Sequence, residues 1–290
     1  MAAIRRRAMV KKILVPLDGS ETAETILPHL RALLKRLDGD VLLLHVCTKS
    51  AREQEVGRAY LDGLAERLTD QFPGIDTMLV VGKPVAKIIE IAITEKADLI
   101  AMATHGRSGL GKLLWGSVAE QLLEKCPVPI LLARPDTAVT DDRTILVPLD
   151  GSARAKSVLA IALDIGAAAD AKLILLTAGV DETPPHLEAA KKMLAGHGVT
   201  VKVLASREKP TPAILEAVQD EGVGLVVLAT HGRTGAAKRA YGSVAADLLH
   251  LLKIPVLVKR TGGLMESAGL KPRKTKMPEG TLPRHPAKYA

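Results

Sequence analysis

The feature that most constrains the fold of this chain is an internal repeat. The segment ILVPLDGS occupies residues 13–20 and returns unchanged at residues 145–152. Two further segments recur in the same order: ATHGR at 103–107 and 229–233, and GSVA at 116–119 and 242–245. A spacing of more than 120 residues is too long for the unit of a solenoid. Each copy is therefore predicted to be a domain.

The length of 290 residues suffices for two domains of about 140 residues each. We place the first domain at residues 10–135 and the second at 143–260, followed by a basic, flexible tail at 261–290. The second copy is the shorter one. We expect the missing residues in the charged helix predicted at 52–70, whose counterpart near 186–195 is brief.

Composition narrows the possible functions. Hydrophobic residues make up 47% of the chain and aromatic residues 2%, so its two cores must be aliphatic, as in buried parallel strands. The scarcity of aromatic residues argues against a stacking platform for single-stranded nucleic acid. The net charge of +8 arises in the ends, with +5 at residues 1–12 and +4 at 261–290, leaving −1 between them. Solvated ends are the favoured interpretation, and weak contact with a polyanion or a membrane surface is the alternative.

The sequence contains few features that indicate where in the cell the protein is located. The two cysteines, Cys47 and Cys126, lie in apolar stretches and match no metal-site or disulfide spacing. The basic N-terminus is not followed by the apolar run of a signal peptide. No apolar run approaches the roughly 20 residues of a membrane-spanning helix. We expect a cytoplasmic protein with no membrane span and no specific nucleic-acid partner.

Short apolar runs alternate with amphipathic stretches in both copies. Strands are predicted near 12–17, 41–47, 77–81, 98–103 and 128–133 in the first copy, and near 144–149, 172–178, 199–204, 224–229 and 255–259 in the second. Helices are predicted near 21–37, 52–70, 84–96 and 117–125, with matching helices in the second copy. Because the strands are buried on both faces and alternate with helices, each copy is predicted to be an α/β domain. Its expected core is a doubly wound, open, Rossmann-like sheet of five parallel strands.

Serine residues mark several predicted helix starts. Ser20 is expected to cap the first helix, which has acidic residues in its first turn. Ser117 and Glu120 match the S-x-x-E pattern of a capping box. In the second copy, Ser243 is expected to cap the equivalent helix, although Ala246 stands at the box position.

One candidate binding loop follows the first strand of each copy. It reads Pro16-Leu17-Asp18 in the first copy and Pro148-Leu149-Asp150 in the second, each continued by Gly-Ser. An acid at the carboxyl end of a central strand lies where open α/β sheets bind ligands, and it can accept hydrogen bonds from a ribose hydroxyl or an adenine amino group. Taken alone, this loop is better explained as a turn with a helix cap.

A second candidate loop follows the fourth strand. Its glycines allow backbone amides to approach an anion, and a helix begins directly after it. In the first copy the loop runs from Ala103 through Gly106 and Arg107 to Gly116 and Ser117, with His105 and Lys112 as further basic residues. In the second copy it runs from Ala229 through Gly232 and Arg233 to Gly242 and Ser243, with His231, Lys238 and Arg239. Both loops flank the switch point between strands one and four, so we predict a phosphate-binding site. The histidines have no acid or nucleophile at triad spacing, and no catalytic residue is predicted.

At these residues the chain resembles a tandem universal stress protein. ATP-binding members of that family carry G-x2-G-x9-G-[ST] after strand four. Here the spacing is kept in both copies, from Ala103 to Gly116-Ser117 and from Ala229 to Gly242-Ser243, with alanine in place of the first glycine. The resemblance covers roughly residues 10–260 and implies the fold of the adenine nucleotide alpha hydrolases.

The resemblance also implies a cofactor and roles for single residues. Asp18 and Asp150 would contact the adenosine part of the ligand, and Val46 and Ala178 would line the adenine pocket. The phosphates would be held by Gly106, Gly116, Ser117, Gly232, Gly242 and Ser243, flanked by Met102, Val118, Leu228 and Val244. The ligand would be ATP, or AMP or ADP, with Mg²⁺ and no metal site made by the protein alone.

Two further expectations concern the assembly and the balance between copies. In this family the last strands of two domains pair, so the strands at 129–132 and 255–258 are expected to pair within the chain as a pseudo-dimer, with a homodimer also possible. Gly82 after strand three is replaced by Glu208 in the second copy, which favours tighter nucleotide binding by the first.

Three functions follow from these features. The first is an ATP-binding protein of stress response or signalling, whose nucleotide changes its conformation or its partners. The second is a slow ATPase, although the chain has no P-loop lysine motif. The third is a nucleotide-free dimer scaffold.

Overall fold

The computed structural model describes residues 10–35, 37, 39–72, 74–104, 116–140, 143–231 and 242–261. Most of the tail predicted at 261–290 lies outside the described residues, as does the greater part of each glycine loop. The first half of the chain comprises β1 (Lys12–Leu17), α1 (Glu21–Glu24), α2 (Ile26–Leu34), β2 (Asp40–Cys47), α3 (Ala51–Leu68), β3 (Ile75–Val81), α4 (Pro84–Thr94), β4 (Leu99–Ala103), α5 (Ser117–Lys125) and β5 (Ile130–Ala133). The second half comprises β6 (Thr144–Pro148), α6 (Ala153–Lys156), α7 (Leu159–Ala169), β7 (Lys172–Ala178), α8 (Pro185–Leu194), β8 (Thr200–Ser206), α9 (Pro210–Asp220), β9 (Val223–His231), α10 (Ser243–Leu251) and β10 (Val256–Thr261).

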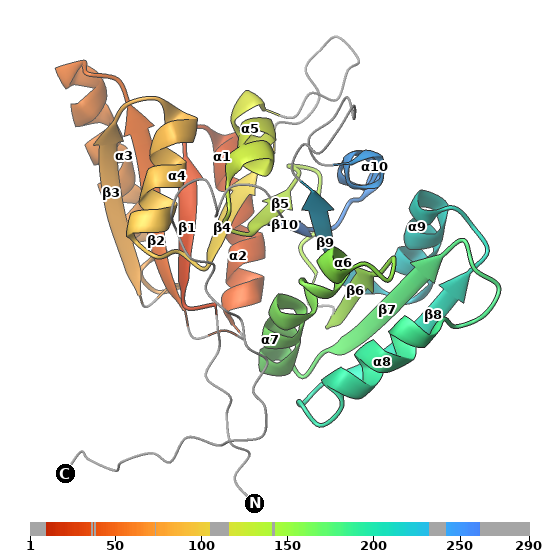
Figure 1. The fold of residues 1–290 in the computed structure, drawn as a ribbon. Coiled ribbons are helices and arrows are strands. Elements are labelled where there is room, and N and C mark those ends of the chain that lie inside the picture. Colours follow the sequence, from red (N-terminus) through yellow and green to blue (C-terminus); the bar gives the residue numbers. More distant parts are fainter. Residues whose placement is uncertain are drawn as a thin grey trace, which may run out of the picture.

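The strands form one sheet in the order β3-β2-β1-β4-β5-β10-β9-β6-β7-β8 (Figure 1). Strands within each half are parallel, and each half has the predicted doubly wound order. The two halves join through an antiparallel pair in which β5 and β10 place Leu131 opposite Leu257. This is the strand pairing expected from the sequence, and it leaves neither strand as an open edge.

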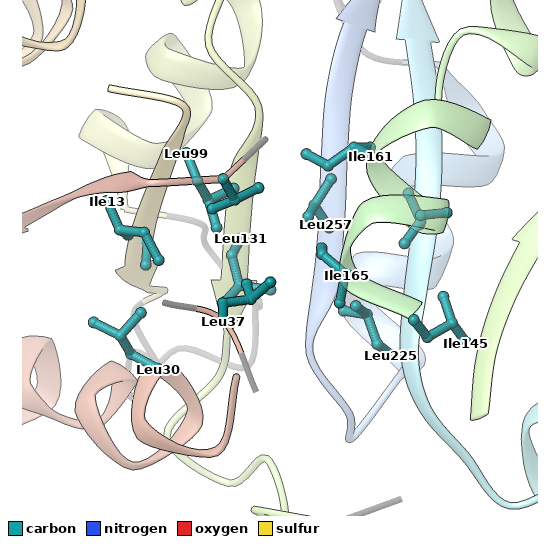
Figure 2. Close-up of a cluster of buried hydrophobic side chains, with 14 of the residues drawn as sticks. Ile13, Leu30, Leu37, Leu99, Leu131, Ile145, Ile161, Ile165, Leu225 and Leu257 are labelled. Carbon is teal, nitrogen blue, oxygen red and sulfur yellow. The ribbon is translucent and has the colours of Figure 1, made fainter. Parts of the chain in front are cut away.

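Helices cover both faces of the sheet. On one face α2, α3, α7 and α8 bury apolar residues, and on the other face α4, α5, α9 and α10 do so. Figure 2 shows labelled side chains of the first core from both halves: Ile13, Leu30, Leu37, Leu99, Leu131, Ile145, Ile161, Ile165, Leu225 and Leu257. The two cores therefore belong to the two faces of the sheet, and each extends through both halves of the chain.

The helix predicted at 21–37 is divided into α1 and α2, which is a correction to the sequence expectation. Pro28 has no N–H to donate to the carbonyl of Glu24, and its ring would collide with that carbonyl in a continuous helix. In the structure α1 ends at Glu24 and α2 begins two residues later, so that Pro28 lies in its first turn. The second half is divided in the same way into α6 and α7, with Ala160 at the position of Pro28, so the proline fits the break but does not alone cause it. The shortening of the second copy lies where we predicted it, since α3 has 18 residues and α8 has 10.

A small cavity of about 60 Å³ lies at the junction between α2 and α7. Its lining is mostly apolar and includes Leu33, Leu131 and Ile165. His29 and Arg143 are the ionisable side chains among the lining residues. His29 is 6% exposed, and this burial lowers its pKa below the ordinary value, so the ring is neutral at pH 7.

The buried His29 is expected to make the stability of the protein depend on pH. Between pH 6.5 and the lower pKa of the folded state, the unfolded chain binds more protons at His29 than the folded chain does. The free energy of unfolding therefore falls as the pH falls through this window, by at most about 1.4 kcal/mol per pH unit. Urea unfolding at several pH values should show a shallower dependence for His29→Leu than for the wild type. His197→Leu, at a half-buried position, serves as the control, and equal slopes for His29→Leu and the wild type would contradict the prediction.

Candidate functional site

The sheet order brings the two candidate loops of each half together. β1 and β4 are parallel neighbours, with Ile13 beside Leu99, and β6 and β9 are paired in the same way. The ends of β1 and β4 therefore lie at the same edge of the sheet, which we call the carboxyl edge. The chain leaves β1 toward one face and returns to β4 from the other, and this reversal opens the crevice in which α/β proteins bind ligands.

The loop after β1 is built as a turn that caps the following helix. Oδ1 of Asp18 accepts hydrogen bonds from Ser20 N at 3.0 Å and from Ser20 Oγ at 2.6 Å. Ser20 Oγ in turn accepts from Ala23 N at 3.1 Å. Gly19 has a φ of +86°, which favours glycine at this position. The predicted helix cap at Ser20 is confirmed, and the exposed Asp18 holds the turn in place.

The second half repeats this turn. Oδ1 of Asp150 accepts from Ser152 N at 2.9 Å, and Ser152 Oγ accepts from Ala155 N at 3.1 Å. Gly151 again has a positive φ of +80°. The identical ILVPLDGS segments therefore produce the same local structure at the carboxyl edge of both halves.

Polar residues on the second strand of each half steady this turn, and they are absent from the predicted site. His45 Nδ1 lies 2.9 Å from the carbonyl of Leu17, and Thr177 Oγ1 donates to the carbonyl of Leu149 at 2.7 Å. Each contact holds the residue just before the aspartate. In the second half His186 Nε2 lies 2.8 Å from Thr177 Oγ1. The available signal was a polar residue, His45 or Thr177, near the end of an apolar run in the strands at 41–47 and 172–178.

The glycine loop is described only at its two ends. Met102 and Ala103 end β4, and Gly116 precedes α5. Leu228 and Ala229 lie near the end of β9, and Gly242 precedes α10. The predicted site residues Gly106, Arg107, Gly232 and Arg233 lie outside the described residues.

The capping box predicted at Ser117 and Glu120 is wrong, and so is the cap predicted at Ser243. Both serines are the first helical residue, so the capping position belongs to Gly116 in α5 and to Gly242 in α10, and neither helix has a side-chain cap. A glycine has no side chain to accept from the first N–H groups of a helix. Within the described residues, the first N–H groups of these two helices therefore have no side-chain cap, and an anion could bind them.

This contrast gives a stability prediction. Ser20→Ala should lower the free energy of unfolding by about 1 kcal/mol, because a helix cap is lost. Ser117→Ala should change it by less than about 0.5 kcal/mol, because Ser117 is exposed and caps no helix. Urea unfolding of the two variants beside the wild type provides the measurement. An equal loss for both would show that Ser117 also stabilises its helix.

The remaining predicted residues divide between the two faces of the sheet. Val46, Met102 and Val118 pack in the core under α4 and α5, and in the second half Ala178, Leu228 and Val244 pack in the same core under α9 and α10. Alternation along β1 and β6 places Pro16 and Pro148 on that face too. By contrast, Leu17, Ala103, Leu149 and Ala229 pack in the core of the opposite face, so only their backbone lies on the side of α5 and α10.

Tyr60 and Gly82 lie near the candidate site of the first half, and they differ in kind: one is a half-buried phenol and the other a glycine with a positive φ. Burial, followed by the negative charge of Glu24 and more weakly of Asp18, raises the pKa of Tyr60, which is therefore a neutral phenol at pH 7. Gly82 has a φ of +154°, and a Cβ there would lie 2.9 Å from Lys87 Cγ. The corresponding Glu208 of the second half is exposed. The two halves therefore differ at this position in charge, because Glu208 is acidic, and in backbone conformation, because Gly82 has a positive φ.

Metal-binding clusters and membrane-spanning helices are both absent from the described residues. No group of three or more His, Cys, Asp and Glu side chains in these residues is arranged to hold a metal ion. No helix among them has both the length and the apolar character needed to cross a membrane.

The fold and the carboxyl edge define a doubly wound α/β protein with two equivalent sites. The model of the universal stress protein family matches residues 9–134 and 178–260. The chain therefore belongs to the universal stress protein family, in a form with two copies of the family fold.

Three known proteins illustrate this relationship. A universal stress protein of Methanocaldococcus jannaschii, MJ0577, is 31% identical over 155 residues, which cover 43% of this chain and 96% of that protein. Universal stress protein Slr1230 of Synechocystis is 24% identical, and the match covers 87% of this chain and all of that protein. The crystal structure of a universal stress protein from Archaeoglobus fulgidus covers 88% of this chain with a TM-score of 0.73 and 22% identity. This last similarity concerns the fold alone.

Proposed function

We propose that this universal stress protein binds ATP, or another adenine nucleotide, at the carboxyl edge of its sheet. The observation that carries the proposal is the start of α5 and α10. Both helices begin at a glycine without a side-chain cap, next to the aspartate turn of the first strand. Among the described helices, α1 and α3 are capped by Ser20 and Ser50. The helices α4, α7, α8 and α9 also lack a side-chain cap, but none of them has glycine at the capping position. Uncapped N–H groups and the positive end of the helix dipole suit a phosphate group.

The two repeats, residues 10–135 and 143–260, are proposed as the units that each hold one nucleotide. In the first unit Gly116 and Ser117 would bind the phosphates, while Asp18 and Val46 would face the adenosine. In the second unit Gly242, Ser243, Asp150 and Ala178 would take these roles. Mg²⁺ would be bound mainly by the phosphates of the nucleotide, since the described residues contain no cluster of ligands for it.

The proposed role of the nucleotide is regulatory. Hydroxyl groups with an acid or imidazole neighbour lie at the described part of the carboxyl edge, but they have structural roles. Ser20 Oγ, beside Asp18, caps α1, and Thr177 Oγ1, beside His186, donates to the carbonyl of Leu149. Tyr60 is protonated at pH 7. Bound nucleotide would instead change the conformation of the protein or its choice of partner in a cytoplasmic stress response. The joined strands β5 and β10 would make the two halves act as a pseudo-dimer.

The proposal is tested by the nucleotide that the purified protein carries and binds. Protein denatured after purification should release an adenine nucleotide, and added ATP should give heat of binding in a calorimeter. A protein that carries no nucleotide and gives no heat with ATP, ADP or AMP would refute the proposal and favour a nucleotide-free scaffold. Turnover of labelled ATP well above background would favour a slow ATPase instead.

A further inference from the structure

The antiparallel junction brings one arginine of each half next to the other half. Arg134 follows β5, and Arg260 is its counterpart in β10, 126 residues later. In the register of β5 and β10, Leu132 lies opposite Val256 and Ile130 opposite Val258. Continued by two residues, this register places Arg134 beside residue 254 and Arg260 beside residue 128. Each arginine thus reaches the segment that follows α10 or α5 of the opposite half.

The guanidinium group of Arg134 is held by three contacts. Its Nε and Nη2 donate to the two carboxylate oxygens of Asp136 at 2.9 and 2.8 Å. Its Nη1 donates to the backbone carbonyl of His250. The side chain is only 16% exposed. The bidentate pair with Asp136 therefore fixes the direction in which the third donor points.

The turn around Arg134 makes further contacts within itself and with the second half. Arg134 N donates to Thr137 Oγ1 at 2.9 Å, and Thr137 N donates to the carbonyl of Arg134 at 2.9 Å. One residue further, Ala138 N donates to the carbonyl of Lys253 at 3.1 Å. We call residues 134–138 the junction clamp. The junction clamp contacts the end of α10 through the side chain of Arg134, and it contacts the segment just after α10 through the backbone N–H of Ala138.

The clamp acts on the helix that begins at the candidate phosphate site of the second half. His250 is one of the last residues of α10, whose terminal carbonyls have no partner within the helix. An arginine that binds such a carbonyl also interacts favourably with the negative end of the helix dipole. The opposite end of the same nine-residue helix is Gly242-Ser243. Rigid secondary elements can carry coupling between two sites, so a displacement at one end of α10 would reach the other end.

We propose that Arg134 is a positioning residue through which the first half sets the position of α10, and with it the phosphate site of the second half. This inference rests on the proposed nucleotide binding. It makes the second site dependent on the conformation of the first half, because the clamp is continuous with β5.

Arg260, which reaches from the second half to the first, has different surroundings from Arg134. Gly262 and Gly263 stand in the sequence where the first half has Asp136 and Thr137, so the carboxylate that orients Arg134 has no counterpart at the equivalent sequence position. Among the described residues, Nε of Arg260 is buried without a hydrogen-bond partner. Its positive charge acts on Cys126 at the end of α5, where burial raises the pKa of the thiol to about 11 and Arg260 opposes that rise. Among the described residues, the hydrogen-bonded arginine that reaches across the junction is therefore that of the first half.

Hydrogen exchange of the full chain tests the clamp without nucleotide. In Arg134→Gln the amides in the last turn of α10 should exchange about tenfold faster than in the wild type, while the amides of α5 should keep their rates. Arg134→Lys, which keeps the charge and one donor, should restore part of the protection, and Asp136→Asn should lose part of it. Arg260→Gln and the exposed Arg207→Gln are matched controls and should leave α10 unchanged. Unchanged exchange of α10 in Arg134→Gln would overturn the proposal.

A second arm with ATP separates the clamp from nucleotide binding. If the wild type gains protection in the first turns of α5 and α10, Arg134→Gln should lose most of that gain in α10 and keep it in α5. Equal gains in both helices of the variant would overturn the coupling. If ATP protects neither helix of the wild type, nucleotide binding itself has failed, and the clamp is then judged on the nucleotide-free rates alone.

Discussion

Replacement of Gly242 by leucine is expected to weaken ATP binding by the second half by about a hundredfold or more. Gly242 has a φ of +81°, and it occupies the capping position of α10. Leucine there would shift the backbone out of this conformation and place a side chain where the proposed phosphate approaches the N–H groups. Calorimetric titration with ATP should show one fewer binding site in Gly242→Leu than in the wild type.

The matched control for this prediction is Gly196→Leu. Gly196 has a φ of +76°, and like Gly242 it has no described atom within 4 Å of the position of a Cβ, but it lies after α8, far along the chain from the glycine loop. Both variants should lose about 1–2 kcal/mol of stability from backbone strain. Only Gly242→Leu should lose a nucleotide. Full occupancy of both sites in Gly242→Leu would contradict the role of this helix end.

The equivalent change in the first half separates steric block from strain. Gly116 has a φ of −55°, which any residue can adopt. Gly116→Leu is therefore expected to keep most of the stability of the wild type and to lose the first binding site. Because the first half keeps Gly82, this site is expected to bind ATP more tightly, so its loss should remove the high-affinity phase of the titration.

Replacement of Leu131 by aspartate is expected to separate the two halves at their junction. Leu131 lies opposite Leu257 in the antiparallel pair, and the two side chains are 2% and 0% exposed (Figure 2). A carboxylate here would be buried without a partner in an aliphatic core. The expected cost is about 3–5 kcal/mol, which should break the three bridged residue pairs between β5 and β10.

Two measurements would detect the separation of the two halves. Urea unfolding of Leu131→Asp should change from one transition to two, and light scattering should detect self-association through the exposed edge of β10. Val139→Asp is the control, because Val139 is 51% exposed just beyond the junction and its change should cost less than about 0.5 kcal/mol. A single transition near that of the wild type would show that the helices, and not β5 and β10, hold the halves together.

Much of the fold could be predicted from the sequence because its signals are local. The repeated ILVPLDGS segments predict the two β1-type strands, the turn at Asp18 and the cap at Ser20, and the structure confirms that cap. Apolar runs such as that at 41–47 identify buried strands without reference to the rest of the chain. The family follows from the spacing of the loops and is shown by the match of the family model to both copies.

The wrongly predicted caps at Ser117 and Ser243 show that a local sequence pattern does not fix the first residue of a helix. The S-x-x-E pattern at Ser117 fits a capping box, yet the helix begins at that serine and leaves Gly116 at the cap. A one-residue shift of the helix start decides whether the N–H groups are satisfied by a side chain or remain available to a ligand. The pattern alone does not contain that shift.

The sequence by itself determined the repeat, the α/β class and the aspartate turn, because each depends on residues within one turn or one strand. The tertiary structure decided that the two cores belong to the faces of one sheet and that Arg134 meets the end of α10. These contacts join residues more than 100 positions apart. Their partners are chosen by the register of β5 on β10, and a register between distant strands has no signal in either strand alone.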